Sequence, residues 1–149
     1  MAQHTPLYHA TAIAFCGYGF LLRGPAGAGK SDLALRLVQE GGVLIADDQT
    51  VLRAQGDLLF ASCPEALKDT LEVRGIGLVH VPTTGFHPVH AIVRLISRDH
   101  LERIPEQTTE TLEDVTLPAF ALDPFMASAL ARFKLFTCIL EDRSFVKTP

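Results

Sequence analysis

Apolar residues occur along the chain in short runs that are separated by glycine, proline or acidic residues. The runs at 20–23 and 43–46 predict strands, and the second is apolar throughout, which is typical of a strand buried on both faces. Between them, residues 31–40 repeat apolar positions at helical spacing and are followed by Gly41-Gly42, so they predict a helix. The order of strand, glycine-rich loop, helix and strand indicates an α/β arrangement.

The rest of the chain also divides into strands and a long helix. Asp123-Pro124 supplies a cap and a first-turn proline for a helix at 125–140, which is expected to pack Phe125 and Phe133 in the core. A strand at 116–122 contains Pro118, which suits the edge of a sheet. The other predicted elements are a strand at 9–16 joined by a tight turn at 17–19 to the strand at 20–23, a hairpin at 50–53 and 58–60, one or two helical turns at 64–68, strands at 71–75 and 91–96, and an exposed loop or short helix at 98–107.

Composition favours one mixed α/β domain over residues 1–149. The chain is 48% hydrophobic, which suffices for one core, and no repeat or linker divides it. Its net charge of −4 argues against general binding of nucleic acids. The three cysteines are expected to be reduced, mostly buried thiols of a cytoplasmic protein. The most apolar segment, 11–22, is too short to cross a membrane, so no span is expected.

Residues 24–31 match the phosphate-loop pattern G-x-x-x-x-G-K-[ST]. Glycines allow the backbone N–H groups to approach a polyphosphate, and the small residues between them leave it room. Lys30 is expected to meet the β- and γ-phosphates, and the Ser31 hydroxyl to bind Mg²⁺. The predicted nucleotide-binding residues are Gly24, Pro25, Ala26, Gly27, Ala28, Gly29, Lys30 and Ser31.

Two acidic residues, Asp47 and Asp48, directly follow the strand at 43–46. Ligands of α/β sheets gather at the carboxyl ends of strands, so these acids are expected to reach the Mg²⁺–phosphate site. Adjacent side chains on an extended strand point to opposite sides and share a site only where the chain turns. A plausible division has one acid orient Mg²⁺ while the other accepts a proton from an attacking hydroxyl.

Other charged residues are less specific. Glu72 and Arg74 share one face of the strand at 71–75, where a solvated ion pair and a functional role both stay open. His87 and His90 are separated by a proline and have no obvious third partner, so a zinc site is disfavoured.

The chain resembles the HPr kinase/phosphorylase family. The family's catalytic domain has a histidine, a G-x-G pair, the phosphate loop, a strand ending in Asp-Asp and the motif L-E-[IV]-R-G-[LI]-G. Here these correspond, in the same order, to His9, Gly17-x-Gly19, residues 24–31, Asp47-Asp48 and residues 71–77. The phosphate loop alone would fit many kinases and ATPases, whereas the combination is specific.

The resemblance implies a P-loop kinase-like mixed sheet with flanking helices, related to the carboxykinase-type nucleotide-binding fold. It also implies transfer of a phosphoryl group from ATP, with Mg²⁺, to a serine of the phosphocarrier protein HPr. By this analogy Lys30 and Ser31 hold phosphates and Mg²⁺, and Asp48 is the base. Asp47 and Glu72 serve the metal, His9 supports the site, and Arg103 resembles the family's later catalytic arginine.

Two differences from the family bear on activity and assembly. Full-length members carry another N-terminal domain, so this chain resembles a short form made of the catalytic domain alone. The family's loop rich in proline and arginine is replaced by residues 122–126, Leu-Asp-Pro-Phe-Met, so the reverse phosphorylase activity is doubtful. The family also implies a homo-oligomer, a hexamer, with no nucleic-acid or membrane partner.

Two alternatives to the kinase stay open at this point. One is a regulatory sensor that binds nucleotide and signals without phosphoryl transfer. The other is a small-molecule phosphotransferase, whose discriminating property is turnover with a metabolite acceptor.

Overall fold

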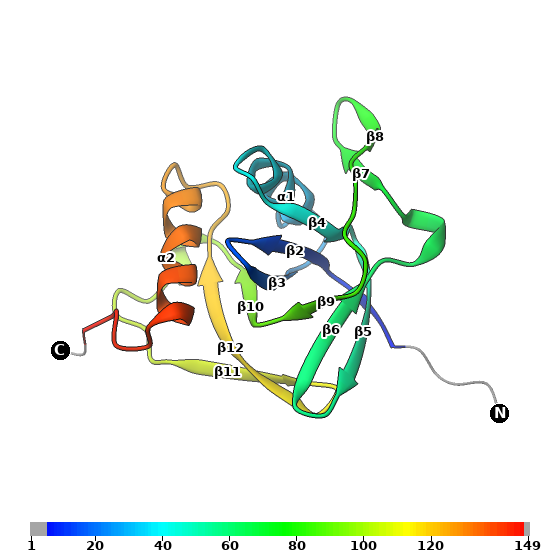
Figure 1. Cartoon of the computed structure of the whole chain (residues 1–149). Helices are drawn as coiled ribbons and strands as arrows, with labels where there is room; N and C mark the ends of the chain where they lie inside the picture. Colours follow the sequence, from blue (N-terminus) through cyan, green and yellow to red (C-terminus); the bar gives the residue numbers. More distant parts are fainter. Residues whose placement is uncertain (1–5, 148–149) are drawn as a thin grey trace.

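The computed structural model describes residues 6–147, which form three layers: helices, a six-stranded sheet and a four-stranded sheet (Figure 1). The hairpin of β7 (Thr70–Val73) and β8 (Gly77–His80) stands beside α1. In spatial order, the larger sheet contains β11 (Thr108–Leu112), β12 (Val115–Leu122), β10 (Ala91–Leu95), β3 (Tyr18–Arg23), β2 (Thr11–Phe15) and β4 (Val43–Ala46). The smaller sheet contains β1 (Leu7–His9), β5 (Gln49–Gln55), β6 (Leu58–Ser62) and β9 (His87–Val89). The helices are α1 (Lys30–Gln39) and α2 (Ala129–Glu141), and short 3₁₀ turns lie at Glu65–Leu67 and Arg98–His100.

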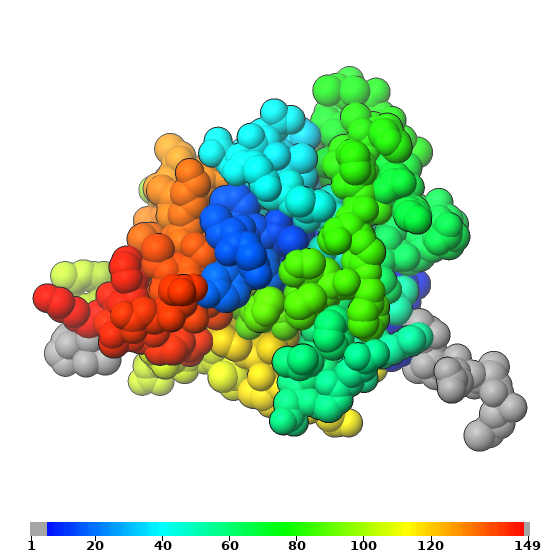
Figure 2. All heavy atoms as spheres, in the orientation of Figure 1, coloured from blue at the N-terminus to red at the C-terminus, as the bar shows by residue number. Residues whose placement is uncertain are grey.

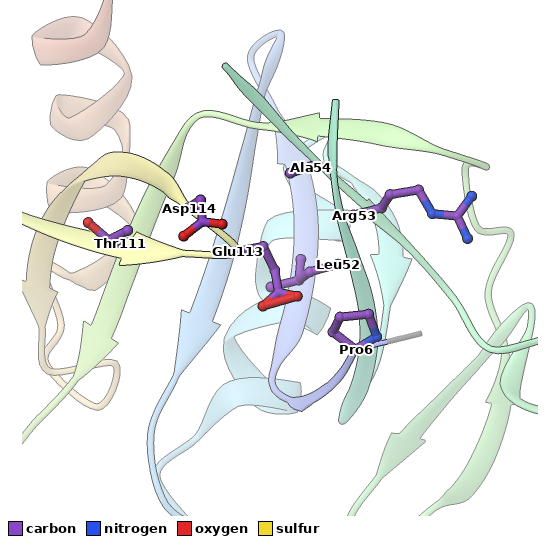
Figure 3. A pocket seen from close by; sticks show the side chains of 7 residues that line it. All are labelled: Pro6, Leu52, Arg53, Ala54, Thr111, Glu113 and Asp114. Carbon is purple, nitrogen blue, oxygen red and sulfur yellow. The ribbon is translucent and has the colours of Figure 1, made fainter. Parts of the chain in front are cut away.

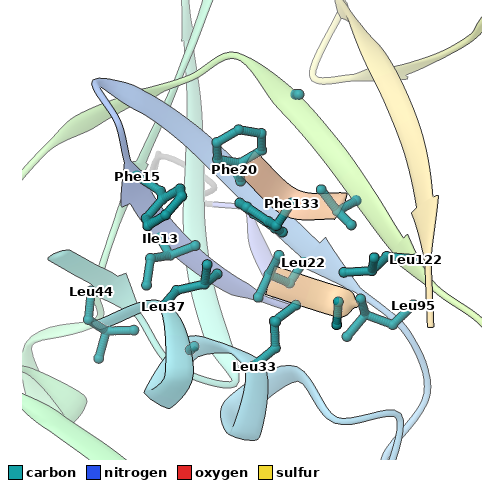
Figure 4. Packing of buried hydrophobic residues seen from close by; sticks show 14 of the residues in the cluster. Ile13, Phe15, Phe20, Leu22, Leu33, Leu37, Leu44, Leu95, Leu122 and Phe133 are labelled. Carbon is teal, nitrogen blue, oxygen red and sulfur yellow. The ribbon is translucent and has the colours of Figure 1, made fainter. Parts of the chain in front are cut away.

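The six-stranded sheet is covered on both faces, which explains its apolar strands. On β3, Phe20 and Leu22 face the helices, where they join Leu33 of α1 and Phe133 of α2 (Figure 4). The intervening Leu21 faces the smaller sheet and belongs to a second buried cluster. The sheet therefore holds the two layers together. The expectation that 43–46 is buried on both faces is confirmed for Leu44 and Ile45, which enter different clusters, whereas Val43 is exposed.

Four strands end at the same edge of the large sheet. β3 pairs in parallel with β10, and β10 with β12. β2 is antiparallel to both β3 and β4, so β4 runs in the direction of β3. The segments that follow these four strands therefore meet at one edge, where α/β sheets bind ligands.

A continuous two-stranded ribbon connects the two sheets. His9 lies opposite Gln49 in the small sheet, and Ala12 lies opposite Ala46 in the large sheet. This register continues through the bend between them, so Thr11 falls opposite Asp47. The chain bends at Asp48, whose φ of 65° is in the left-handed region.

Several elements differ from the sequence-based predictions. Pro118 was expected to mark an edge, but β12 is interior, because β11 pairs with it on its outer side. The proline pairs with Thr109, and pairing with β10 begins only at Ala119. The last helix begins at Ala129 instead of residue 125, because 124–128 forms turns.

The expected core packing of the last helix is correct except at its start. Phe133 is fully buried and Phe136 packs against the same cluster, whereas Phe125 is 69% exposed. The cysteines are free, as expected, but Cys16 is exposed and the others are only partly buried. None of the helices within residues 6–147 is long and apolar enough to span a membrane.

Candidate active site

The phosphate loop joins β3 to α1 and has the backbone conformation that its glycines predict. Gly27 and Gly29 have φ values of 83° and 99°, which are in the left-handed region. Gly24 is needed for a different reason: the loop packs closely against it, and a Cβ at this position would lie 2.8 Å from the Cβ of Ala28. The loop can therefore turn its N–H groups toward an anion at the start of α1.

Lys30 is buried at the first position of α1 and curls back over the loop. Its Nζ donates hydrogen bonds to the carbonyl oxygens of Gly24, at 2.5 Å, and Pro25, at 3.1 Å. Burial lowers the pKa of the Lys30 ammonium below 10.5, and the nearby carboxylates Asp48 and Asp47 partly oppose this shift. The ammonium thus lies at the loop, where phosphate charge would stabilise it.

Ser31 and Asp47 form a compact pair of oxygen donors beside the loop. Ser31 Oγ donates to Asp47 Oδ1 at 2.6 Å, and Asp47 is only 8% exposed. Its second oxygen accepts from the backbone N–H of Glu72 at 3.2 Å. Hydroxyl and carboxylate oxygens are suitable ligands for Mg²⁺, which commonly takes one or two carboxylates together with substrate phosphates.

Asp48 lies against a histidine on the open side of the bend. Its Oδ1 is 2.7 Å from Nε2 of His9, and the two side chains are 55% and 56% exposed. Because the chain turns at Asp48, the two acids lie close together but face different partners. Asp47 faces Ser31 and Asp48 faces His9, which is the arrangement that a division between a metal ligand and a proton acceptor requires.

Thr11 fixes the backbone of this acid pair, and sequence reasoning did not find it. Its side chain is fully buried, and its Oγ1 donates to Asp47 Oδ1 at 3.3 Å. The same oxygen accepts from the backbone N–H of Asp48 at 3.1 Å. The only signal in the sequence was a hydroxyl residue in an apolar strand; its role follows from the ribbon register, which places Thr11 opposite Asp47.

Two predicted residues are less closely tied to this centre. Glu72 contributes its backbone N–H to Asp47, while its side chain is exposed. Arg103 lies in an exposed segment and makes no ion pair within the described residues. Among those residues, Glu72 and Arg74 do not form the ion pair that had been considered. The roles of Glu72 and Arg103 stay predictions.

A cleft of about 450 Å³ adjoins the start of the phosphate loop. Arg23 and Arg94 are neighbours in the β3–β10 register, and both pair with Glu110 of β11, Arg94 through Nε at 3.0 Å. Two guanidinium groups sharing one carboxylate leave a positive charge, which suits a phosphate-bearing ligand. Neither arginine was predicted, although Arg23 directly precedes the loop. The cleft is lined by His9, Arg23, Gly24, Pro25, Arg94, Leu95, Ile96 and Glu110.

A second hollow, of about 500 Å³, lies between β5 and the β11–β12 turn (Figure 3). Glu113 in its wall accepts a hydrogen bond from the Tyr8 hydroxyl at 2.8 Å. Burial and this carboxylate raise the pKa of Tyr8 above 10.0. The hollow shares no residue with the phosphate loop or the acid pair, so it is separate from the candidate site.

The donors at the candidate site fit a magnesium nucleotide. The loop offers backbone N–H groups and Lys30, and the bend offers one buried carboxylate next to a hydroxyl. Within residues 6–147, no cluster of three or more His, Cys, Asp or Glu residues forms a complete metal cage.

Known proteins share both the sequence and the fold. A family model described as the HPr serine kinase C-terminal domain matches residues 1–119. The HPr kinase/phosphorylase of Bordetella pertussis is 35% identical over 124 residues, covering 75% of this chain and 38% of that protein. The enzyme of the same name from an Exiguobacterium species is 43% identical over 76 residues, covering 50% and 24%.

The structure of the Hpr(Ser) kinase/phosphatase from Coxiella burnetii is similar, with a TM-score of 0.76 and 25% identity. The match covers 89% of this chain and 98% of that one. The chain spans 24% to 38% of the length of the two sequence relatives above. The match to the family model, which extends over most of the chain, and the shared P-loop kinase-like fold show that the chain belongs to the HPr serine kinase C-terminal domain family.

Proposed function

We propose that this protein transfers the γ-phosphoryl group of ATP to a serine hydroxyl of an HPr-type phosphocarrier protein. The observation that carries the proposal is the bend at Asp47-Asp48, which presents one acid to Ser31 and the other to His9. A metal ligand and a proton acceptor beside one phosphate loop are the parts that phosphoryl transfer needs.

In this proposal each residue near the loop has one task. Lys30 balances the phosphate charge, while Ser31 and Asp47 hold Mg²⁺, which would neutralise charge on the phosphates. Asp48 takes the proton from the attacking serine, and His9 holds the carboxylate in the orientation for this transfer. Glu72 assists the metal and Arg103 stabilises the charge on the transferring group.

The exposure of the proton acceptor favours a protein as the phosphoryl acceptor. The Asp48 side chain is 55% exposed, so a serine on a protein surface can reach it. A kinase acting on a small metabolite commonly encloses its acceptor to exclude water. The β7–β8 hairpin projects from the molecule beside α1 (Figure 2). Ile76 in its turn and Leu78 in its outer strand are 78% and 77% exposed. Such apolar side chains suit contact with another protein.

The test is a transfer reaction with the protein, ATP, Mg²⁺ and a cognate HPr, analysed by mass spectrometry. The expected product is HPr with one added phosphate on a serine, formed only when all four components are present. Nucleotide binding without transfer would instead indicate a sensor. Turnover with a metabolite and no protein acceptor would indicate a small-molecule phosphotransferase.

A further inference from the structure

An exposed aromatic ring lies against the phosphate loop at Gly29, two residues before Ser31. A Cβ on Gly29 would lie 3.0 Å from Phe125 Cζ and 3.0 Å from Pro124 Cγ, so both rings touch the residue that caps α1. Phe125 nevertheless remains 69% exposed. Burial in the core therefore does not account for a large apolar ring at this position.

The segment that carries the ring is held by three hydrogen bonds. The buried Asp123 accepts from the backbone N–H of Phe125 at 2.9 Å and from that of Arg98 at 2.8 Å. Arg36 of α1 donates to the carbonyl oxygen of Pro124. The backbone that carries the ring is therefore held by both the phosphate-loop helix and the segment after β10. A ligand that binds the ring needs to order little of this backbone, so the entropic cost of binding is small.

The strand order gives the direction in which a nucleotide would extend. Asp47 and Asp48 follow β4, which lies on one side of β3, and Phe125 follows β12, which lies on the other side (Figure 1). A nucleotide with its γ-phosphate toward Asp48 must extend its other end away from β4. The base then comes to the side of the loop where Phe125 presents its ring.

We propose that Phe125, supported by Pro124, forms the stacking surface of the nucleobase subsite. This inference rests on the proposed use of ATP at the same loop. Aromatic side chains stack on nucleobases with little dependence on base identity, because every base has a π face. Phe125 therefore adds affinity for the base alone, while the phosphates are bound by residues 24–31.

Two ligands separate these contributions: ATP, and tripolyphosphate as the same anionic chain without a base. Calorimetry is expected to show Phe125→Ala binding ATP about tenfold to a hundredfold more weakly, with tripolyphosphate affinity unchanged. Phe125→Trp is expected to retain ATP affinity. Phe145→Ala removes another half-exposed phenyl ring and serves as the control, with both affinities unchanged.

Phe125→Trp also supplies a direct signal, because the chain has no other tryptophan. Its fluorescence should change on adding ATP and stay constant on adding tripolyphosphate. Equal weakening of both ligands by Phe125→Ala would overturn the subsite, since the ring would then only support the loop, and so would no weakening of either. A wild-type chain that binds tripolyphosphate but not ATP would overturn both this inference and the proposed function, whereas ATP binding independent of Phe125 would leave the proposed function intact.

Discussion

Nε2 of His9 lies 2.7 Å from Oδ1 of Asp48. His9 is the last residue of β1, and Asp48 lies in the bend between β4 and β5. Asp47 on the same bend contacts Ser31 of the phosphate loop. The two acids thus face different partners, and each contact can be removed without removing the other. This makes the roles of the two acids separable by substitution.

Asp48→Asn tests the proton acceptor. The amide keeps the size and a hydrogen-bonding oxygen for His9 but cannot take a proton, so phosphoryl transfer should fall by about a hundredfold or more. ATP affinity should stay the same, because Asp47, the proposed metal ligand, is unchanged. Phosphorylated HPr is measured by mass spectrometry and ATP binding by calorimetry. The control is Asp57→Asn, at an exposed position in the β5–β6 turn; unchanged transfer in Asp48→Asn would remove Asp48 from the mechanism.

His9→Asn tests the orientation of the carboxylate. Misplacement of a reacting group by a small distance lowers rates strongly, so we expect kcat to fall by roughly tenfold to a hundredfold with the KM for ATP unchanged. His100→Asn, at an exposed histidine after β10, is the matched control. A rise in the KM for ATP with kcat intact would mean that His9 acts in nucleotide binding instead.

Thr11→Val and Thr11→Ser test the buried hydroxyl that joins both acids. Valine leaves the Asp48 N–H without its partner and should lower the free energy of unfolding by about 1–3 kcal/mol, which urea titration measures. It should also weaken Mg²⁺-dependent ATP binding through Asp47. Serine restores the hydroxyl and should recover both properties. Wild-type stability and ATP binding in Thr11→Val would contradict this role of the hydroxyl.

Gly29→Ala has a closely matched control in Gly41→Ala. The two glycines have φ values of 99° and 98°, so alanine meets a similar backbone penalty of about 1–2 kcal/mol at either site. Only at Gly29 would the new methyl group lie 3.0 Å from two rings, since nothing lies within 4 Å at Gly41. Calorimetry should therefore show loss of ATP binding in Gly29→Ala alone. Equal ATP affinity in the two variants would contradict the crowding at the loop.

The pH dependence of ATP binding tests the environment of Lys30. Burial lowers its pKa below 10.5, so the ammonium loses its proton at a lower pH than an exposed lysine would. Since the charged form binds phosphate, ATP affinity should decrease as the pH rises through this lowered pKa. Calorimetry between neutral pH and pH 10.5 measures the decrease, and Lys30→Met should bind weakly and without this dependence. A wild-type affinity constant over that range would contradict the prediction.

The phosphate loop and its flanking strand and helix could be predicted because their signals are local. Glycine spacing, helical periodicity and the acids after an apolar run lie within residues 20–48. The resemblance added His9, whose contact with Asp48 spans 39 positions and has no local signal. Thr11 was missed for the same reason, because only the register of the ribbon gives its hydroxyl two partners.

The errors in the fold also have physical causes. β11 reads Thr-Thr-Glu-Thr-Leu, which lacks an alternation of apolar residues, since as an outer strand it buries little. Without β11, the proline in β12 suggested an edge. Asp123-Pro124 gives a strong signal for the start of a helix. The Asp123 carboxylate, however, also accepts a hydrogen bond from the backbone of Arg98, and this long-range contact accompanies the turns that precede α2.

The ribbon that runs through the bend imposes a constraint on chain length. Side chains alternate along a strand with a period of two. One residue added or removed between His9 and Thr11 would move them out of register with the acids, and one added or removed directly before Asp47 would reverse which acid faces the phosphate loop. The buried carboxylate would then point to His9, and the proton acceptor would point to Ser31. Outside His9, Thr11, Asp47 and Asp48, the arms from 7 to 12 and from 46 to 51 can thus accept changes of residue but no single insertion or deletion, and related chains should keep these segments at constant length even where their sequences diverge.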